Sequence, residues 1–290
     1  MIRDNQGGVI SGTDVHARQA DLRIEERAST DFMQRWNSTD LLVLPGQRKG
    51  TYVAGLACSD RCVDEVLRLR YEVFNIELGE GLAHSSIAGL DRDEFDSQMS
   101  HIVLYDTATK RVVGTYRVQT IEHAMKHAGI YSSQLFVFKG LESFYPRTVE
   151  VGRACLAQDH RNLAAIITLW WGLGEYMNLF GQQYLFGCCS LTTQDPDDGW
   201  RAMKTLRQRG HLHPEIMLAT QPTHSCGDSS REFDADLGPA IKLPKLFRTY
   251  MTMGAHVISG PAIDRDFGTV DFIVFLDATI VTFSQLEVVR

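Results

Sequence analysis

The sequence lacks the excess of basic residues that a general nucleic-acid-binding protein needs. Its 290 residues include 29 Lys and Arg but 36 Asp and Glu, which gives a formal net charge of −7 at pH 7. Binding to nucleic acid requires a basic footprint that meets the phosphates. We therefore expect no nucleic-acid partner, although this balance still allows a small local basic patch.

Several short motifs of familiar enzyme classes are also missing. The chain contains no G-x-S-x-G, no Walker loop and no G-x-G-x-x-G. His123 and His127 have the i, i+4 spacing of metal ligands, but the glutamate of an H-E-x-x-H motif does not lie between them. The cysteines show no metal-ligand spacing either: Cys58, Cys62, Cys155, Cys188, Cys189 and Cys226. We predict no bound metal.

The composition otherwise indicates one soluble globular domain with a sizeable core, because 44% of the residues are hydrophobic and 22% are charged. MIRDNQGGVI lacks the basic start and apolar core of a signal peptide, which favours a cytoplasmic protein with reduced thiols. Residues 1–48 mix charges with few apolar runs. We expect a polar, mobile extension there and a single domain over 49–290.

From residue 50 onward, the hydrophobic pattern predicts an α/β domain. Helices are expected at 59–74, 162–181 and 195–210. Extended runs are expected at 50–57, in a hairpin of 101–106 and 112–120, and at 147–156, 184–191, 255–259 and 269–276; residues 131–138 fit no single pattern.

The helix at 162–181 is apolar nearly all round, and about 20 such residues are long enough to span a bilayer. However, Gly172, Gly174 and Glu175 interrupt it, and a strand pattern lies on each side. A helix between two buried strands is typical of an α/β crossover. We therefore predict that it belongs to the core.

Charged residues stand at unusual places in this domain. The strand RTVEVGRACL (147–156) carries Glu150 and Arg153 around Gly152, although charges are rarely buried unless they are paired or used. Strict alternation puts the two charges on opposite faces, whereas a bulge at Gly152 turns both to one side. Further charges lie at helix and strand ends: Arg70, Asp93, Asp96, His101 and Arg117. Together they suggest a charged cluster beside the sheet.

The order of elements resembles a Gcn5-related N-acetyltransferase fold. The stretches LRYEVFNIELG, DRDEFD, HIVLYD, VVGTYRVQT, EVGRACLAQDHRN, LWWGLGEYM and YLFGCCSLTTQDP are similar, in order, to the ornithine-acyl carrier protein N-acyltransferases of that superfamily. So is the C-terminal block LPKLFRTYMTMGAHVISGPAIDRDFGTVDFIVFL, and the match covers roughly 50–277. The resemblance implies a mixed, mostly antiparallel sheet flanked by helices, with a bulge whose free N–H faces a thioester carbonyl.

A thinner resemblance links the chain to acyl-homoserine-lactone synthases. It rests on Arg70 with Phe74, Asp93 with Asp96, Arg117, and Glu150-Val151-Gly152-Arg153. Those synthases also carry a tryptophan shortly after the phenylalanine, and NIELGEGLAH (75–84) has none. The first resemblance therefore implies the better hypothesis, an N-acyltransferase; an autoinducer synthase and an inactive binding homologue remain the alternatives.

The resemblance also implies which acyl donor is used. Acetyl-CoA enzymes of the superfamily place Q/R-x-x-G-x-G/A before the long helix, so that backbone N–H groups hold the pyrophosphate. Here QDHRNLAAI (158–166) has no glycine. We therefore expect no bound cofactor, and the acyl-phosphopantetheine of acyl carrier protein as donor. The partners are then acyl carrier protein, an amino acid acceptor and, peripherally, a membrane surface.

The implied residue roles are as follows. Glu150 is the candidate general base and His101 the alternative, with the backbone at Gly152 stabilising the oxyanion. Arg117 and Arg153 either bind the amino acid carboxylate or hold the acidic loop through Asp93 and Asp96. Arg70 and Phe74 complete the substrate site; Trp170 and Trp171 line an acyl tunnel or pack in the core, and Cys188 and Cys189 are buried apolar residues. Carrier-protein contacts are expected from Arg161, in the turn before the long helix, and from Arg201, Lys204 and Arg207 of the basic helix GWRAMKTLRQRG, for which a solvated helix end is the alternative.

Overall fold

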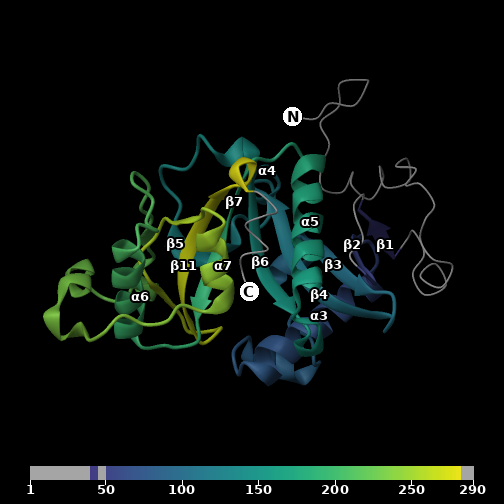
Figure 1. Ribbon diagram of the computed structural model, residues 1–290, viewed down its shortest axis with the longest axis horizontal. Helices are drawn as coiled ribbons and strands as arrows, with labels where there is room; N and C mark the ends of the chain where they lie inside the picture. The colour runs from purple at the N-terminus through teal and green to yellow at the C-terminus, as the bar shows by residue number, and fades with distance from the viewer. Residues whose placement is uncertain (1–39, 45–49, 282–290) are drawn as a thin grey trace.

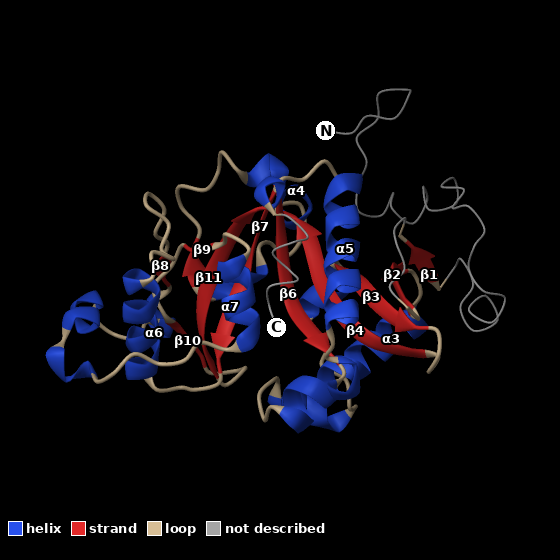
Figure 2. Ribbon diagram, in the orientation of Figure 1, coloured by secondary structure: helices blue, strands red, loops and turns tan. Residues whose placement is uncertain are grey.

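The computed structural model describes residues 40–44 and 50–281. Its main sheet has nine strands in the order β1-β2-β3-β4-β6-β7-β11-β10, with β9 pairing β11 (Figures 1 and 2). Strands β6 and β7 run parallel and the other neighbours antiparallel. The strands are β1 (Leu41–Val43), β2 (Tyr52–Ala57), β3 (Ser100–Asp106), β4 (Arg111–Thr120), β6 (Thr148–Leu156), β7 (Tyr184–Leu191), β9 (His256–Val257), β10 (Ala262–Asp264) and β11 (Thr269–Asp277). A mixed, mostly antiparallel sheet is confirmed.

Helices cover both faces of this sheet. They are α3 (Asp60–Tyr71), α4 (Ile121–Ala124), α5 (Leu163–Leu179), α6 (Pro196–Gln208) and α7 (Lys245–Thr252). In β4, Tyr116 contacts Trp170 of α5 and Tyr250 of α7, whereas Arg117 shares Asp96 with Arg70 of α3. Because neighbouring residues of a strand point to opposite faces, α3 lies on one face, and α5 and α7 lie together on the other. Figure 2 shows α5 and α7 in front of the strands.

Helix α5 is the core helix that the sequence predicts. Asn162 caps it by accepting a hydrogen bond from the backbone N–H of Ala165. A Cβ atom at Gly172 would lie 2.9 Å from the Cβ of Ala54, so this glycine lets the helix approach β2 closely. Among the residues that the structure describes, no helix has both the length and the apolar character needed to cross a membrane.

Other predicted boundaries need correction. The described part of the predicted extension, residues 40–44, contains β1, which pairs with β2 through buried Leu41 and Leu42. Order therefore begins before residue 49; residues 1–39 and 45–49 lie outside the described residues. The predicted helix at 59–74 ends as α3 at Tyr71 and continues as a π-helix over Glu72–Glu77. The ambiguous 131–138 segment forms a 3₁₀ turn (Tyr131–Gln134) and β5 (Phe136–Val137), which pairs with β8 (Ala219–Thr220).

Strands β6 and β7 form a fork. They are paired only from Thr148↔Tyr184 to Glu150↔Phe186, and beyond that point they diverge (Figure 2). At Gly187, just after the last pair, a Cβ atom would lie 2.1 Å from the carbonyl oxygen of Val151. Only glycine fits this close approach of two backbones. The fork therefore opens at a place that the local sequence fixes.

Candidate active site

A cavity of about 280 Å³ occupies the fork between β6 and β7. In β7 it is lined by Leu185 and Cys189 on one face of the sheet and by Cys188 and Ser190 on the other, so it passes through the plane of the sheet. The rest of the lining comes from the β6 run Val151, Gly152, Arg153 and Ala154, from α7 and β11, and from the segment after α3. Its size is near the lower end of typical ligand pockets, roughly 300–1,000 Å³.

The two ends of the cavity differ in character. On the face of α5 and α7 the lining is apolar and aromatic, and the hydroxyls of Tyr116 and Tyr250 lie 3.0 Å apart. On the opposite face it is polar, with Tyr131, Ser132, Arg153, Asp264 and Asp271. Leu78 and Leu246 also line the cavity and remain 42% and 41% exposed, so the mouth of the cavity is assigned to these two side chains.

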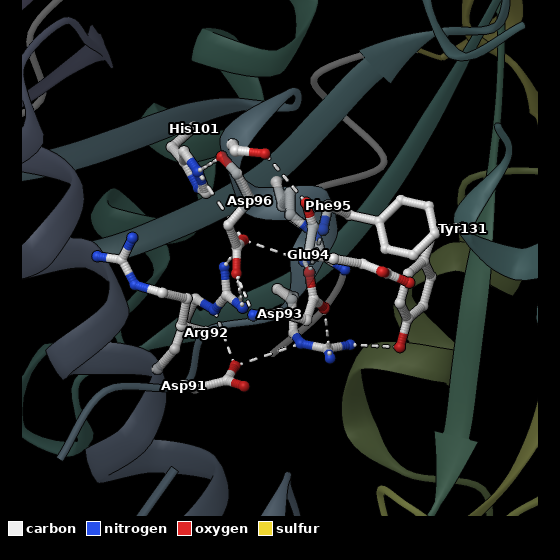
Figure 3. Close-up of polar contacts among 12 residues, drawn as sticks. Asp91, Arg92, Asp93, Glu94, Phe95, Asp96, His101 and Tyr131 are labelled. Carbon is white, nitrogen blue, oxygen red and sulfur yellow. Dashed lines mark hydrogen bonds and ion pairs between the residues drawn. The ribbon is translucent and has the colours of Figure 1, made fainter. Parts of the chain in front are cut away.

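Three arginines and three aspartates form a buried network next to the polar end (Figure 3). Arg70 Nε donates to Asp91 at 2.8 Å and its Nη1 to Asp96 at 2.6 Å. Arg117 Nη1 donates to Asp93 at 2.6 Å and to Asp96 at 3.0 Å. Arg153 Nη2 donates to Asp93 at 3.1 Å. Of the two predicted roles for Arg117 and Arg153, the geometry favours holding the acidic loop.

The electrostatics of the network keep its aspartates ionised. Burial raises the pKa of Asp96, but Arg117 and Arg70 outweigh that effect and hold the pKa far below its usual range. The pKa of Asp91 is lowered in the same way, against burial, by Arg153 and Arg70. Asp91 is fully buried and joins α3 to β6, yet the sequence analysis missed it. Its position two residues before Asp93 in the same loop was the available signal.

His101 lies behind this network rather than in the cavity. It is 2% exposed, does not belong to the cavity lining, and its Nε2 donates to the backbone carbonyl of Asp96 at 3.3 Å. Burial and the charge of Arg70 lower its pKa to about 4, so the ring is neutral at neutral pH. This position does not support the prediction of His101 as an alternative base.

The carboxylate of Glu150 is likewise engaged in hydrogen bonds within the protein. The residue is 1% exposed, and its carboxylate accepts from Gln119 Nε2 (2.8 Å), Tyr131 N (2.9 Å), Ser132 N (2.7 Å) and Ser132 Oγ (2.7 Å). It does not line the cavity, whereas Tyr131 and Ser132 do. A carboxylate surrounded by four donors has no free position for a substrate proton. The geometry therefore favours a positioning role for Glu150 over the predicted role of general base.

The predicted bulge exists one residue later than expected. Thr115 lies opposite Cys155 and Arg117 opposite Gly152, so Tyr116 faces both Arg153 and Ala154. Arg153 adopts a left-handed φ of 49° there. Gly152 precedes the bulge and lines the cavity. The expectation that both charges turn to one side is right: Glu150 accepts from the backbone of Tyr131, and Arg153 Nη1 donates to its hydroxyl at 3.0 Å.

The predicted carrier-protein contacts are largely engaged within the chain. Arg161 pairs with Glu77, Arg201 with Asp198, and Arg207 with the buried Glu232. Lys204 forms no ion pair among the residues that the structure describes. The sequence pattern missed the pairs of Arg161 and Arg207 because Glu77 and Glu232 are far from these arginines along the chain, whereas Asp198 lies only three residues before Arg201.

The remaining predicted residues divide between cavity and core. Phe74 lines the cavity and packs edge-to-face on Phe267 at 5.4 Å. Trp170 packs on Tyr116 and Tyr250 behind the apolar end, and neither it nor Trp171 belongs to the lining, which favours core packing. Cys188 and Cys189 do line the cavity, where burial raises the pKa of both thiols. The two cysteines therefore remain uncharged thiols.

Comparison with known proteins agrees with this architecture. A family profile for an acetyltransferase (GNAT) domain matches residues 69–171. The L-ornithine N(alpha)-acyltransferase of Rhodobacter capsulatus is 31% identical over 220 residues, which cover 72% of this chain and 83% of that protein. The chain belongs to the L-ornithine N(alpha)-acyltransferase family. It is therefore an acyltransferase. The family's Brucella abortus protein is 27% identical over 247 residues, covering 79% of this chain and 85% of its own.

Solved structures with a similar arrangement are much more distant. The N-acyl amino acid synthase FeeM from uncultured soil microbes is 11% identical, with a TM-score of 0.45 over 79% of this chain and 90% of that one. The acyl-homoserine-lactone synthase LasI is also 11% identical, with a TM-score of 0.43 over 79% and 91% of the two chains.

The role of Glu150 in this acyltransferase is testable with Glu150→Gln. Each carboxylate oxygen accepts from one backbone N–H and one side chain, so whichever becomes an amide NH₂ group faces donors. We expect a loss of about 1–3 kcal/mol in the free energy of unfolding, measured by chemical denaturation. The residual activity should keep the wild-type pH profile.

Glu142→Gln is the matched control, because that side chain is exposed and, within the described residues, its carboxylate accepts a hydrogen bond only from the backbone of Gly140. It should leave stability and activity unchanged. Wild-type stability in Glu150→Gln, together with lost turnover and one pKa missing from the pH profile, would restore the general-base role.

Proposed function

We propose that this enzyme transfers a fatty acyl chain, including 3-hydroxy chains, from acyl carrier protein to the α-amine of ornithine and so forms a lyso-ornithine lipid. The observation that carries this proposal is the cavity through the β6–β7 fork, which has an apolar and a polar end. Such a passage fits a substrate pair in which a lipid thioester meets a charged amine. The names of the relatives support ornithine as the acceptor.

The reaction needs an electrophile held next to a neutral amine. The amine nitrogen attacks the thioester carbonyl, the C–N bond forms, the C–S bond breaks, and the carrier thiol leaves with a proton. Beyond Glu150, β6 has no pairing with β7, and its run Gly152–Ala154 borders the cavity. We assign the backbone N–H groups of this run to the carbonyl oxygen, because such donors stabilise a developing oxyanion.

The donor side supports a carrier protein rather than coenzyme A. The turn before α5, which contains Gln158–His160 and the cap Asn162, has no glycine that would let the backbone surround a pyrophosphate. A phosphopantetheine arm carries a single phosphate and needs no such cradle.

The surface beside the cavity mouth suggests where the carrier protein docks. Lys242, Lys245 and Arg248 are exposed next to Leu246, and none forms an ion pair among residues 40–44 and 50–281. Carrier proteins are acidic, so free cations around an apolar opening are complementary to them. We place the docking site on α7 rather than on α6.

The acyl-transfer proposal is tested by mixing the purified protein with 3-hydroxyacyl carrier protein and ornithine. We expect stoichiometric release of carrier thiol and a new acyl-ornithine detected by mass spectrometry, with acyl-coenzyme A a much poorer donor. Thiol release with S-adenosylmethionine instead of ornithine would identify an autoinducer synthase. No release with any amine would leave a binding homologue and refute the proposal.

The docking site is tested by charge reversal. Lys242→Glu with Lys245→Glu should raise the KM for acyl carrier protein about 10-fold or more, with the KM for ornithine unchanged, because attraction between the proteins becomes repulsion. The matched control, Lys204→Glu with Arg209→Glu on and next to α6, changes the charge equally. An effect of the control pair alone would move the docking site back to α6.

We also infer weak attachment to a membrane surface, because the acylated product partitions into lipid by about 0.8 kcal/mol for each buried CH₂ group. Leu246, exposed at the mouth, lies on α7 between Lys245 and Arg248, and Leu78 is a second exposed leucine of the cavity lining. The protein should float with vesicles rich in anionic phospholipid and be released by high salt. Binding that only detergent reverses would contradict this mode of attachment.

A further inference from the structure

The polar end of the cavity carries negative charge that the acyl-transfer chemistry above does not use. Asp264 and Asp271 line it, Glu80 lines the same cavity, and Arg153 is the only Lys or Arg among the described lining residues. The charge of Arg153 is already matched, because it lies within 3.2 Å of both Asp91 and Asp93. The carboxylates of the cavity therefore face it without a compensating cation.

Asp271 stands out among these carboxylates. It lies on β11 opposite Ser190, is 4% exposed, and its Oδ1 accepts from the Thr269 hydroxyl at 2.9 Å. No Lys, Arg or His in the described part of the chain forms an ion pair with it. A buried carboxylate without a cation is costly to maintain. Its position in the cavity wall lets a ligand supply the missing charge.

The carboxylate of Asp264 is held by hydrogen bonds that shape a turn. Its Oδ1 accepts from the backbone N–H groups of Asp266 and Phe267 at 3.0 and 2.9 Å, which shapes the turn between β10 and β11. It adds negative potential near Asp271 while its own carboxylate closes the turn. Asp271 is thus the carboxylate at this end that is best placed to bind a cation.

A second feature of the same end points to a zwitterionic ligand. Arg153 is nine-tenths buried, and its Nε makes no hydrogen bond within the described residues, although Asp91 lies 3.2 Å away. The Arg153 guanidinium, which is paired with Asp91 and Asp93, thus borders the same end of the cavity as Asp271, which has no cationic partner among the described residues. An amino acid with a cationic side chain carries two ammonium groups and one carboxylate. Its charges complement those of the cavity.

We propose that Asp271 binds the side-chain ammonium of the acceptor and thereby restricts the enzyme to basic amino acids. This inference rests on the proposed function, since it names the residue that selects the acceptor. The α-amine is then left for the thioester in the fork, and the side-chain amine is held away from it. Asp271 would explain both the choice of acceptor and the choice between its two amines.

The test compares two acceptors of equal chain length in wild type and Asp271→Asn. Ornithine carries the terminal ammonium, and norvaline lacks it. We expect Asp271→Asn to raise the KM for ornithine on the order of 100-fold, the effect of truncating one partner of a buried charge pair, with little change for norvaline. Asp277→Asn, at the outer end of the same strand and outside the cavity lining, should change neither value.

Equal losses with both acceptors, in a variant whose melting temperature is unchanged, would make Asp271 a general base or a structural residue and overturn the inference. Calorimetric binding of the two amino acids to wild type separates this failure from that of the proposed function. Tighter binding of ornithine without acylation would refute the function and keep the inference. Equal binding of both amino acids would refute the inference whatever the activity.

The acceptor preference should also depend on pH. Burial and the neighbouring Asp264 raise the pKa of Asp271 to about 6; Arg153 opposes this, and the thiols of Cys188 and Cys189 face it from β7. Below pH 6 the carboxyl group becomes neutral and no longer forms an ion pair with the side-chain ammonium of the acceptor. The ratio of kcat/KM for ornithine to that for norvaline should therefore fall as pH drops through 6. A ratio that stays constant, or falls equally in Asp271→Asn, would contradict the assignment.

Discussion

The site depends on the buried pairing of Arg70, Arg117 and Arg153 with the aspartates of one loop. These arginines come from α3, β4 and β6, so their ion pairs join three elements that are distant in the sequence. Removing one partner of such a group leaves a buried charge uncompensated, which typically costs about 3–5 kcal/mol. Arg153 extends the network to the Tyr131 hydroxyl, and through it to the polar wall of the cavity.

The cavity itself results from two irregularities in β6. Its pairing with β7 ends at Glu150, and its register with β4 shifts around Arg153 and Ala154. Glu150, at the last paired position, holds Tyr131 and Ser132 against the sheet through three hydrogen bonds and accepts a fourth from Gln119. A buried carboxylate that looks catalytic in the sequence thus supports the loop beside the cavity, whereas Asp271 on β11 lines the cavity itself.

Which basic side chains are available to a partner depends on their ion pairs within the protein, not on how many cations a segment contains. The cations of α6 look like a docking surface in the sequence, yet Arg201 pairs with Asp198 of its own helix and Arg207 with Glu232. Those of α7, beside the cavity mouth, have no such partners among the described residues. An acidic protein can in this way present a small basic surface where an acidic partner must approach.

Much of the fold could be predicted from the sequence alone. The hairpin of β3 and β4, the core helix α5 and the strands β6, β7 and β11 follow from hydrophobic periodicity, and the multi-block resemblance of the sequence indicates the family. Of the predicted charged cluster, Arg70, Asp93, Asp96, Arg117 and Arg153 do form one ion-pair network with His101 beside it, whereas Glu150 hydrogen-bonds to Gln119, Tyr131 and Ser132 instead. These features depend on local patterns that a single segment carries.

The roles within the cluster were decided only by the tertiary structure. Whether Glu150 meets a substrate or four internal donors depends on the loop at Tyr131, which the sequence left ambiguous. The bulge fell at Arg153 rather than at glycine because the register with β4 fixed it there, against the residue's own preference. Asp271 belongs to a strand that reads as ordinary core, and it faces the cavity because β6 turns away from β7. Long-range pairing sets which groups are satisfied within the protein and which are left for a ligand.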